Sequence, residues 1–195
     1  MNRVSIKAVV SAAIFMFVGS AVAYAQSTNN NGNLGSNPPF VSKLNVDIVK
    51  PIPVFNAVSA NAKQYENVAV YSPSGKLVNL DARRQPILFE AYWCPHCQRT
   101  IVMLNKHRSQ LSSFPILVSF GFQPNTSLHQ AIKLTSTELK ALNIKNVKVY
   151  YVLQYHIRSY APNGIPELVF SHSDKLESLS GEHTLQIWKM ALESR

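Results

Sequence analysis

Residues 86–97 read PILFEAYWCPHC and contain the only two cysteines of the chain, Cys94 and Cys97. The apolar run 86–92 predicts a strand that is buried on both faces and central in its sheet. A segment with helical periodicity begins at Gln98, so the dithiol lies where a strand passes into a helix. The first amides of a helix have no intrahelical acceptor, and they stabilise a nearby anion together with the helix dipole. We therefore expect Cys94 to be the more acidic thiol and the attacking one.

The spacing of the two cysteines favours chemistry over a structural role. Outside the cytosol, a cysteine pair commonly forms a stabilising disulfide. Such a bond stabilises most when it closes a long loop, whereas only Pro95 and His96 separate Cys94 from Cys97. We therefore interpret the pair as a redox-active disulfide. Covalent haem attachment is excluded because Gln98 stands where that motif requires a histidine, and the local ligands are too few for a zinc site.

The N-terminus has the pattern of an export signal. A basic start with Arg3 and Lys7 precedes the apolar run 8–22 and a small-x-small site at residues 23–25. We predict a signal peptide over residues 1–25, and hence a periplasmic or extracellular protein with no stable membrane span after cleavage. A retained N-terminal anchor is the alternative, although the run is at or below the roughly 18 residues that a span requires.

The chain is strongly basic, with a formal net charge of +9 at pH 7. Loss of Arg3 and Lys7 with the signal lowers the charge from +9 to +7. The remaining cations are scattered along the sequence and lack the clustered footprint of a nucleic-acid site. We therefore expect no nucleic-acid partner and a solvated basic surface.

Turn residues and periodicity divide the rest of the chain into segments. Residues 26–39 are rich in Ser, Asn, Gly and Pro and predict a flexible linker. Residues 40–67 are an N-terminal extension with a helix over 57–65, and the main domain covers 68–195. A helix is predicted to start at Ser136, with Glu138 near its N-terminus. The other predicted strands cover 68–71, 76–80, 115–122, 147–153, 167–170 and 175–179, and the last helix covers 182–193.

These features resemble the thioredoxin superfamily. The resemblance rests on Trp93 with the two cysteines, on Gly164-Ile165-Pro166, and on the strand, turn, strand, glycine and helix that follow, and it covers about residues 68–193. It implies an α/β, thioredoxin-like fold with a central mixed β-sheet flanked by helices. The layout is most similar to the exported TlpA and ResA branch, whereas Pro95-His96 is what the DsbA-type oxidases carry.

When the family's motif is matched position by position, the resemblance implies roles for the two cysteines and for the loop at Pro166. Cys94 would be the exposed nucleophile and Cys97 the resolving cysteine, joined to each other as a disulfide in the oxidised form. Pro166 would be a cis-proline whose loop lies against that disulfide and pairs with the substrate backbone. Substrate contacts are expected from residues in this loop and beside the cysteines: Ile165, Pro166, Trp93 and Pro95.

Glu90 is a candidate proton shuttle. It lies two residues after Leu88, which fills the position of the family's buried acid, and strand alternation places both side chains on the same face. If Glu90 is buried there, its pKa is raised and it can exchange a proton with the cysteine pair. The alternative is a carboxylate at the strand edge paired with Arg83 or Arg84.

His96 is the second candidate for a catalytic side chain. An imidazole at this position can donate to the Cys94 thiolate, which stabilises the reduced form and makes the disulfide more oxidising. The alternative is a solvated residue at the start of the helix that has no partner. The predicted catalytic set is therefore Cys94, Cys97, His96 and Glu90.

The predicted function is an exported thiol–disulfide oxidoreductase that exchanges disulfides with protein thiols through Cys94 and Cys97 and acts as an oxidase. The layout favours the alternative of a reductase of exported protein thiols, of the kind used in cytochrome c maturation. A soft-metal chaperone for copper and an inert adaptor are further alternatives. A separate redox partner must reset the site, because the chain has no third cysteine. No cofactor and no metal are expected beyond the redox-active disulfide.

Overall fold

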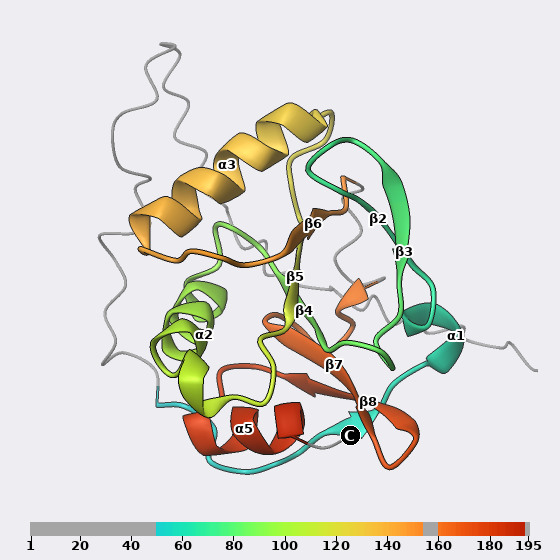
Figure 1. The fold of residues 1–195 in the computed structure, drawn as a ribbon, viewed down its shortest axis with the longest axis vertical. Helices are drawn as coiled ribbons and strands as arrows, with labels where there is room; N and C mark the ends of the chain where they lie inside the picture. Colours follow the sequence, from blue (N-terminus) through green and yellow to red (C-terminus); the bar gives the residue numbers. More distant parts are fainter. Residues whose placement is uncertain (1–49, 154–159, 194–195) are drawn as a thin grey trace, which may run out of the picture. The chain divides into compact units, whose positions relative to one another are not determined.

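The structure, a computed structural model, describes residues 50–153 and 160–193. The predicted signal peptide, the alternative N-terminal anchor, the linker over 26–39 and residues 40–49 of the extension lie outside the described residues. The described residues are built around one eight-stranded sheet. Figure 1 shows this sheet between the helices that flank it.

The sheet places β4 near its middle, as the apolar run predicted. The strand order is β1-β8-β7-β4-β5-β6-β2-β3. The pairs β4–β5 and β5–β6 are parallel, and the other neighbouring strands are antiparallel. The prediction of an α/β fold with a central mixed sheet is therefore confirmed. The strands are β1 Val58–Ser59, β2 Val68–Tyr71, β3 Leu77–Leu80, β4 Ile87–Glu90, β5 Ile116–Ser119, β6 Val149–Tyr151, β7 Glu167–His172 and β8 Lys175–Ser180.

Alternating residues of β4 pack into two different cores. Leu88 packs in the cluster that contains Leu104 and Trp188, so this face of the sheet is covered by α2 and α5. Phe89 points to the opposite face and packs with Tyr65 of α1, with ring centroids 5.8 Å apart. Burial of each such side chain contributes roughly 1.5–3 kcal/mol. The helices are α1 Ala62–Tyr65, α2 Pro95–Lys106, η2 Arg108–Gln110, α3 Leu128–Ala141 and α5 Leu185–Glu193.

The helix α3 is longer than predicted and begins earlier. Its N-cap is Ser127, whose hydroxyl accepts from the Gln130 N–H at 3.3 Å, while the Gln130 side chain accepts from the Ser127 N–H at 2.8 Å. This reciprocal pair is a capping box. The predicted start at Ser136 is wrong, because the Ser136 hydroxyl donates to a carbonyl one turn earlier within the helix. Glu138 consequently lies in the last turn of α3 and not near its N-terminus.

The described part of the N-terminal extension holds the loop between β8 and α5. The N–H of Ile52 donates to the Glu182 carbonyl at 2.8 Å, and the N–H of Thr184 donates back to the Ile52 carbonyl at 3.1 Å. The strand β1 adds to the sheet edge beside β8. The prediction of one helix over 57–65 is wrong, since β1 occupies 58–59 and only 62–65 are helical.

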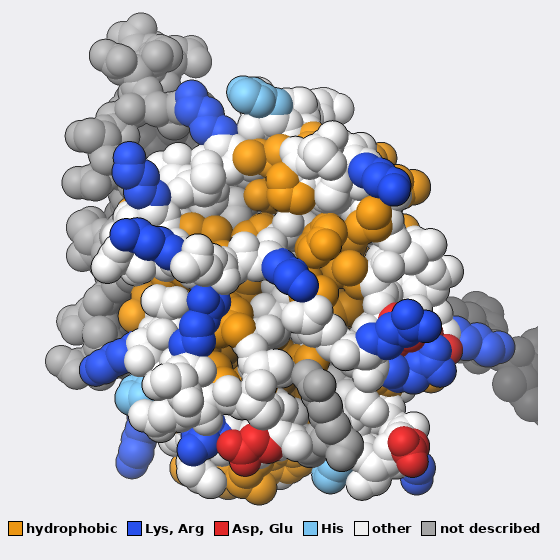
Figure 2. Space-filling model, in the orientation of Figure 1, with side chains coloured by type: hydrophobic (Ala, Val, Ile, Leu, Met, Phe, Trp, Pro, Cys, Tyr) orange, Lys and Arg blue, Asp and Glu red, His pale blue; other side chains and the backbone are white. Residues whose placement is uncertain are grey.

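The surface carries scattered cations. Figure 2 shows one face, on which Lys and Arg side chains are separated by neutral and hydrophobic groups and acidic side chains are few. On this face the cations do not gather in a single stripe. Within the described part of the chain, no helix is both long enough and apolar enough to cross a bilayer.

Candidate active site

The two cysteines lie where β4 passes into α2. Cys94 is the N-cap residue of α2, and Pro95 is its first helical residue, a position where the missing N–H of proline has no cost. The helix therefore begins three residues earlier than its apolar periodicity indicated. Both cysteines are free thiols in this structure. Cys94 was expected to be exposed, yet it is only 4% exposed, while Cys97 is completely buried, so Cys94 is the more accessible of the two.

The two thiols have opposite acidities. A hydrogen bond from the Cys97 thiol lowers the pKa of Cys94, and the backbone N–H groups of His96 and Cys97 add to this effect against the opposing effect of burial. Burial raises the pKa of Cys97 well above its usual value, and its hydrogen bond to Cys94 raises it further. The thiolate therefore forms at Cys94 and the proton stays on Cys97. This is the asymmetry predicted from the helix start.

The loop before β7 lies against the dithiol. The Ile165–Pro166 peptide bond is cis, which is the isomer that the resemblance implied. Ile165 packs against the cluster formed by Ala91 and the two cysteines. The Pro166 carbonyl accepts a hydrogen bond from the Gly181 N–H at 2.8 Å, which ties the loop to the end of β8. The structure thus brings the predicted loop residue Ile165 to the cysteine pair, and Pro166 follows it in the chain.

Exposed side chains flank Cys94 on the solvent side. Trp93 is 36% exposed, and its indole Nε1–H donates to the Gly121 carbonyl at 2.9 Å, which fixes the ring beside the site. Pro95 and His96 are also exposed. Of the four residues predicted to contact a substrate, Trp93 and Pro95 are exposed, Ile165 is half-buried and Pro166 is buried.

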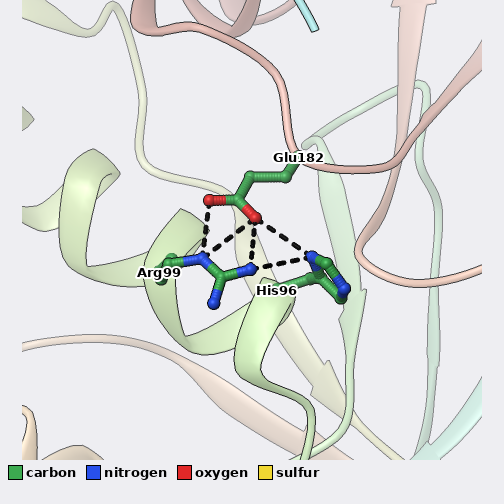
Figure 3. A network of polar contacts seen from close by, with 3 residues as sticks. All are labelled: His96, Arg99 and Glu182. Carbon is green, nitrogen blue, oxygen red and sulfur yellow. Dashed lines mark hydrogen bonds and ion pairs between the residues drawn. The ribbon is translucent and has the colours of Figure 1, made fainter. Parts of the chain in front are cut away.

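The His96 imidazole contacts an ion pair, as Figure 3 shows. Its Nδ1 lies 2.9 Å from Nη2 of Arg99 and 3.1 Å from Oε2 of Glu182. Arg99 itself donates to both oxygens of Glu182, with distances of 2.7 to 3.0 Å. Both side chains of this ion pair are less than 10% exposed. Its residues come from α2 and from the loop after β8.

This contact changes the role predicted for His96. The hydrogen bond that His96 gives to Cys94 comes from its backbone N–H, and the imidazole faces Glu182 and Arg99 instead. The positive charge of Arg99 also interacts with Cys94. Although burial alone would raise it, the pKa of Glu182 is held below its usual value by the hydrogen bonds from Arg99 and His96. Arg99 and Glu182 are therefore site residues that the sequence did not indicate.

Glu90 is completely buried, as the strand parity suggested. Burial raises its pKa to about 7, and the nearby Ser119 hydroxyl opposes this only in part. The negative charge of Glu90 acts on both cysteine thiols, since it raises the pKa of each. The alternative pairing with Arg83 or Arg84 is contradicted, because both arginines form ion pairs with Asp81.

A second buried carboxyl, Glu138, belongs to the same site and was missed. Burial raises its pKa to about 10, and the charges of Glu90 and Cys94 act in the same direction, while the side chain of Gln98 opposes them in part. The sequence did carry a signal for it. Ser127 and Gln130 have the spacing of a capping box, and a helix started there places Glu138 on the same face as the buried Thr135 and Leu139.

Among the described residues, no group of three or more His, Cys, Asp or Glu side chains is arranged to hold a metal ion. The two thiols therefore have no third protein ligand of these types within this part of the chain. Soft metals are bound by thiolates, so a two-thiolate site is the limit of what the described residues offer.

No protein-family model matches the sequence, and no curated protein matches it. Similar solved structures include a secreted Mycobacterium tuberculosis disulfide oxidoreductase homologous to E. coli DsbE, with 13% identity over 67% of this chain and 96% of that chain and a TM-score of 0.46. StoA from Bacillus subtilis is 14% identical over 73% and 100% of the two chains, with a TM-score of 0.43. A thio-disulfide isomerase from Thermus thermophilus is 14% identical over 74% and 95%, with a TM-score of 0.42.

Proposed function

We propose that this protein is an exported thiol–disulfide oxidoreductase that exchanges disulfides with protein thiols through Cys94 and Cys97. The observation that carries the proposal is the opposite acidity of two neighbouring thiols at a helix start. Cys94 ionises readily and has some exposed surface, whereas Cys97 is buried and keeps its proton. A stabilising disulfide needs no such asymmetry, but disulfide exchange does, because the thiolate is the attacking species.

In the oxidising direction, a substrate thiolate attacks the Cys94 sulfur of the Cys94–Cys97 disulfide. The S–S bond breaks, Cys97 leaves as a thiolate, and Glu90 in its acid form gives it a proton. A second substrate thiolate then attacks the substrate sulfur of the mixed disulfide and releases the Cys94 thiolate. The substrate loses two electrons, which remain on the dithiol until a separate redox partner removes them. The redox centre is the cysteine pair itself, without a cofactor or metal.

Stabilisation of the Cys94 thiolate supports the oxidase direction. The Cys97 thiol, two backbone N–H groups and the charge of Arg99 all favour this anion. A stabilised reduced form makes the disulfide a stronger oxidant. The second candidate is a reductase of exported protein thiols, and one observation favours it. The His96 imidazole faces Glu182 and not the thiolate, so it does not supply the stabilisation expected from Pro95-His96.

A trapping experiment tests the proposal. With Cys97→Ala, the second thiol can no longer resolve a mixed disulfide, so proteins should accumulate on Cys94 in bonds that dithiothreitol releases. The Cys94→Ser, Cys97→Ala double variant is the matched control and should capture nothing. An empty trap, together with wild-type protein inactive in both insulin reduction and oxidative refolding, would contradict the function. The direction follows from the reduction potential, where a value at or below roughly −270 mV, that of thioredoxin, would reject the oxidase.

A further inference from the structure

A cluster of buried polar side chains lies beneath the dithiol, between the sheet, α2 and α3. Such groups are rarely found in a core unless they are hydrogen-bonded or functional. Disulfide exchange as proposed above uses one of them, Glu90, and leaves the others without a role. The members are completely buried and are Glu90, Gln98, Ser119, Thr135 and Glu138.

Strand and helix geometry brings the two carboxyls of this cluster together. Glu90 of β4 is the direct neighbour of Ser119 on β5. The Ser119 hydroxyl lies 3.1 Å from the Thr135 hydroxyl on α3. Glu138 follows Thr135 by three residues, so the two side chains share one face of α3 in successive turns. Glu138 therefore faces the end of β4, where Glu90 lies.

The cluster contains polar atoms that lack hydrogen-bond partners. Within the described part of the chain, five side-chain oxygens of the cluster have no hydrogen-bond partner at normal distance and angle. They are both carboxyl oxygens of Glu90, both of Glu138, and Oε1 of Gln98. The Gln98 Nε2 donates to the Tyr92 carbonyl at 2.6 Å, and the same side chain also acts on Glu138, whose pKa it lowers. Two ionised carboxylates at this depth would be very unfavourable, so one of them keeps its proton. The Ser119 hydroxyl and the Gln98 amide each lower the pKa of one carboxyl, and a proton on one carboxyl adds a donor for a direct bond between the two.

The position of Glu138 identifies it as the protonated member. It lies in the last turn of α3, where the negative end of the helix dipole opposes a carboxylate. Glu90 instead lies at the end of a central strand, near the Ser119 hydroxyl. The remaining titratable groups around the pair are Cys94 at the N-cap of α2, Cys97 within α2, Tyr92 and Tyr151. Burial raises the pKa values of both tyrosines, so they stay neutral.

We propose that Glu138 is a positioning residue that keeps its proton and donates a hydrogen bond to the Glu90 carboxylate. This inference rests on the proposed disulfide exchange and deepens it. In the reduced protein and in the mixed disulfide, the hydrogen bond holds Glu90 ionised near neutral pH, ready to take the proton of Cys97 when that sulfur attacks. The disulfide form that results carries Glu90 in its acid form. The same proton returns to Cys97 in the opposite direction. One proton moves between Glu90 and Cys97, and the proton of Glu138 stays in place.

The test is the titration of Glu90 in the reduced protein, followed by NMR of the side-chain carboxyl carbons. Glu90→Gln identifies the signal by its loss. In Glu138→Leu the donor is gone, and the Glu90 midpoint should rise by about one to two pH units, the worth of one hydrogen bond to a charged group. Glu138→Gln keeps a donor and should leave the midpoint near that of the wild type. An unchanged midpoint in Glu138→Leu would refute the hydrogen bond, and a lowered one would show that Glu138 is charged.

The wild-type protein supplies a test that needs no variant. At pH 7 the Glu138 carboxyl carbon should have the chemical shift of a protonated acid, and the shift of a carboxylate would overturn the inference. Trapping and turnover separate this inference from the proposed function. If the protein exchanges disulfides but Glu138→Leu leaves the Glu90 midpoint unchanged, only the carboxyl pair is rejected. If the protein exchanges no disulfides but Glu138→Leu raises the Glu90 midpoint as expected, only the proposed disulfide exchange is rejected.

Discussion

Replacing Glu138 with Gln should make the free energy of unfolding depend less on pH. The pKa of Glu138 is raised from 4.5 in the unfolded chain to about 10 in the folded one, mainly by burial. Between these two values, the folded protein holds one proton more than the unfolded protein at this site. Stability then falls as pH rises, because raising the pH favours the state with fewer bound protons. Glutamine has no proton to lose and removes this dependence.

The size of the effect follows from the pKa difference. Each pH unit inside the window changes the free energy of unfolding by about 1.36 kcal/mol for one proton. From pH 5 to pH 8, three units lie between the unfolded and folded pKa values of Glu138. The wild type should therefore lose about 4 kcal/mol more than Glu138→Gln over this range. Local opening of the last turn of α3 would let the carboxyl reach water and reduce the difference.

Urea unfolding of the reduced protein at pH 5 and pH 8 measures this difference. The comparison is between the pH dependence of the wild type and that of Glu138→Gln, so any constant cost of burying an amide cancels. Glu193→Gln is the matched control, since Glu193 is exposed at the end of α5, and it should leave the pH dependence unchanged. Equal pH dependence in the wild type and Glu138→Gln would refute the burial of a protonated Glu138.

Three other predictions concern the active-site ion pair and two backbone positions. Glu182→Gln leaves the charge of Arg99 uncompensated and should lower the pKa of Cys94, whereas Arg99→Met should raise it by about one unit. The pH dependence of alkylation by iodoacetamide measures both shifts. Equal pH profiles in the wild type and the two variants would contradict the role of this ion pair. Gly181 has a φ of +98°, so Gly181→Ala should destabilise by about 1–3 kcal/mol in urea unfolding, and a neutral result would show that the loop adapts. Ser127→Ala should cost about 1 kcal/mol by loss of the N-cap, and an unchanged midpoint would show that this cap contributes nothing.

The local features of the site could be predicted from the sequence. The strand β4, the passage from strand to helix at the cysteines and the greater acidity of Cys94 all depend on residues within a dozen positions of one another. Strand alternation placed Glu90 on the same face as Leu88, but it left open whether the carboxyl is buried or paired with an arginine at the strand edge. These predictions rest on backbone periodicity and on amides next to the sulfur, which do not depend on distant parts of the chain.

The partners of the side chains could not be predicted in the same way. His96 contacts Glu182, which lies 86 residues further along the chain, and no local pattern links the two. Glu138 was assigned to a helix start because Ser136 resembles an N-cap. The true cap, Ser127, lies nine residues earlier, and Ser136 is in the helix interior. One misplaced helix start thus concealed the second buried carboxyl.

Two consecutive residues after β8 contact two different parts of the active site. Gly181 supports the Pro166 carbonyl, and Glu182 holds Arg99 and the His96 ring. The proline loop, which is expected to receive a substrate, and the groups that set the acidity of the sulfur are therefore bound to the same short piece of backbone. A substrate that presses on the proline loop would also strain the arginine and the imidazole, so docking and sulfur reactivity should change together.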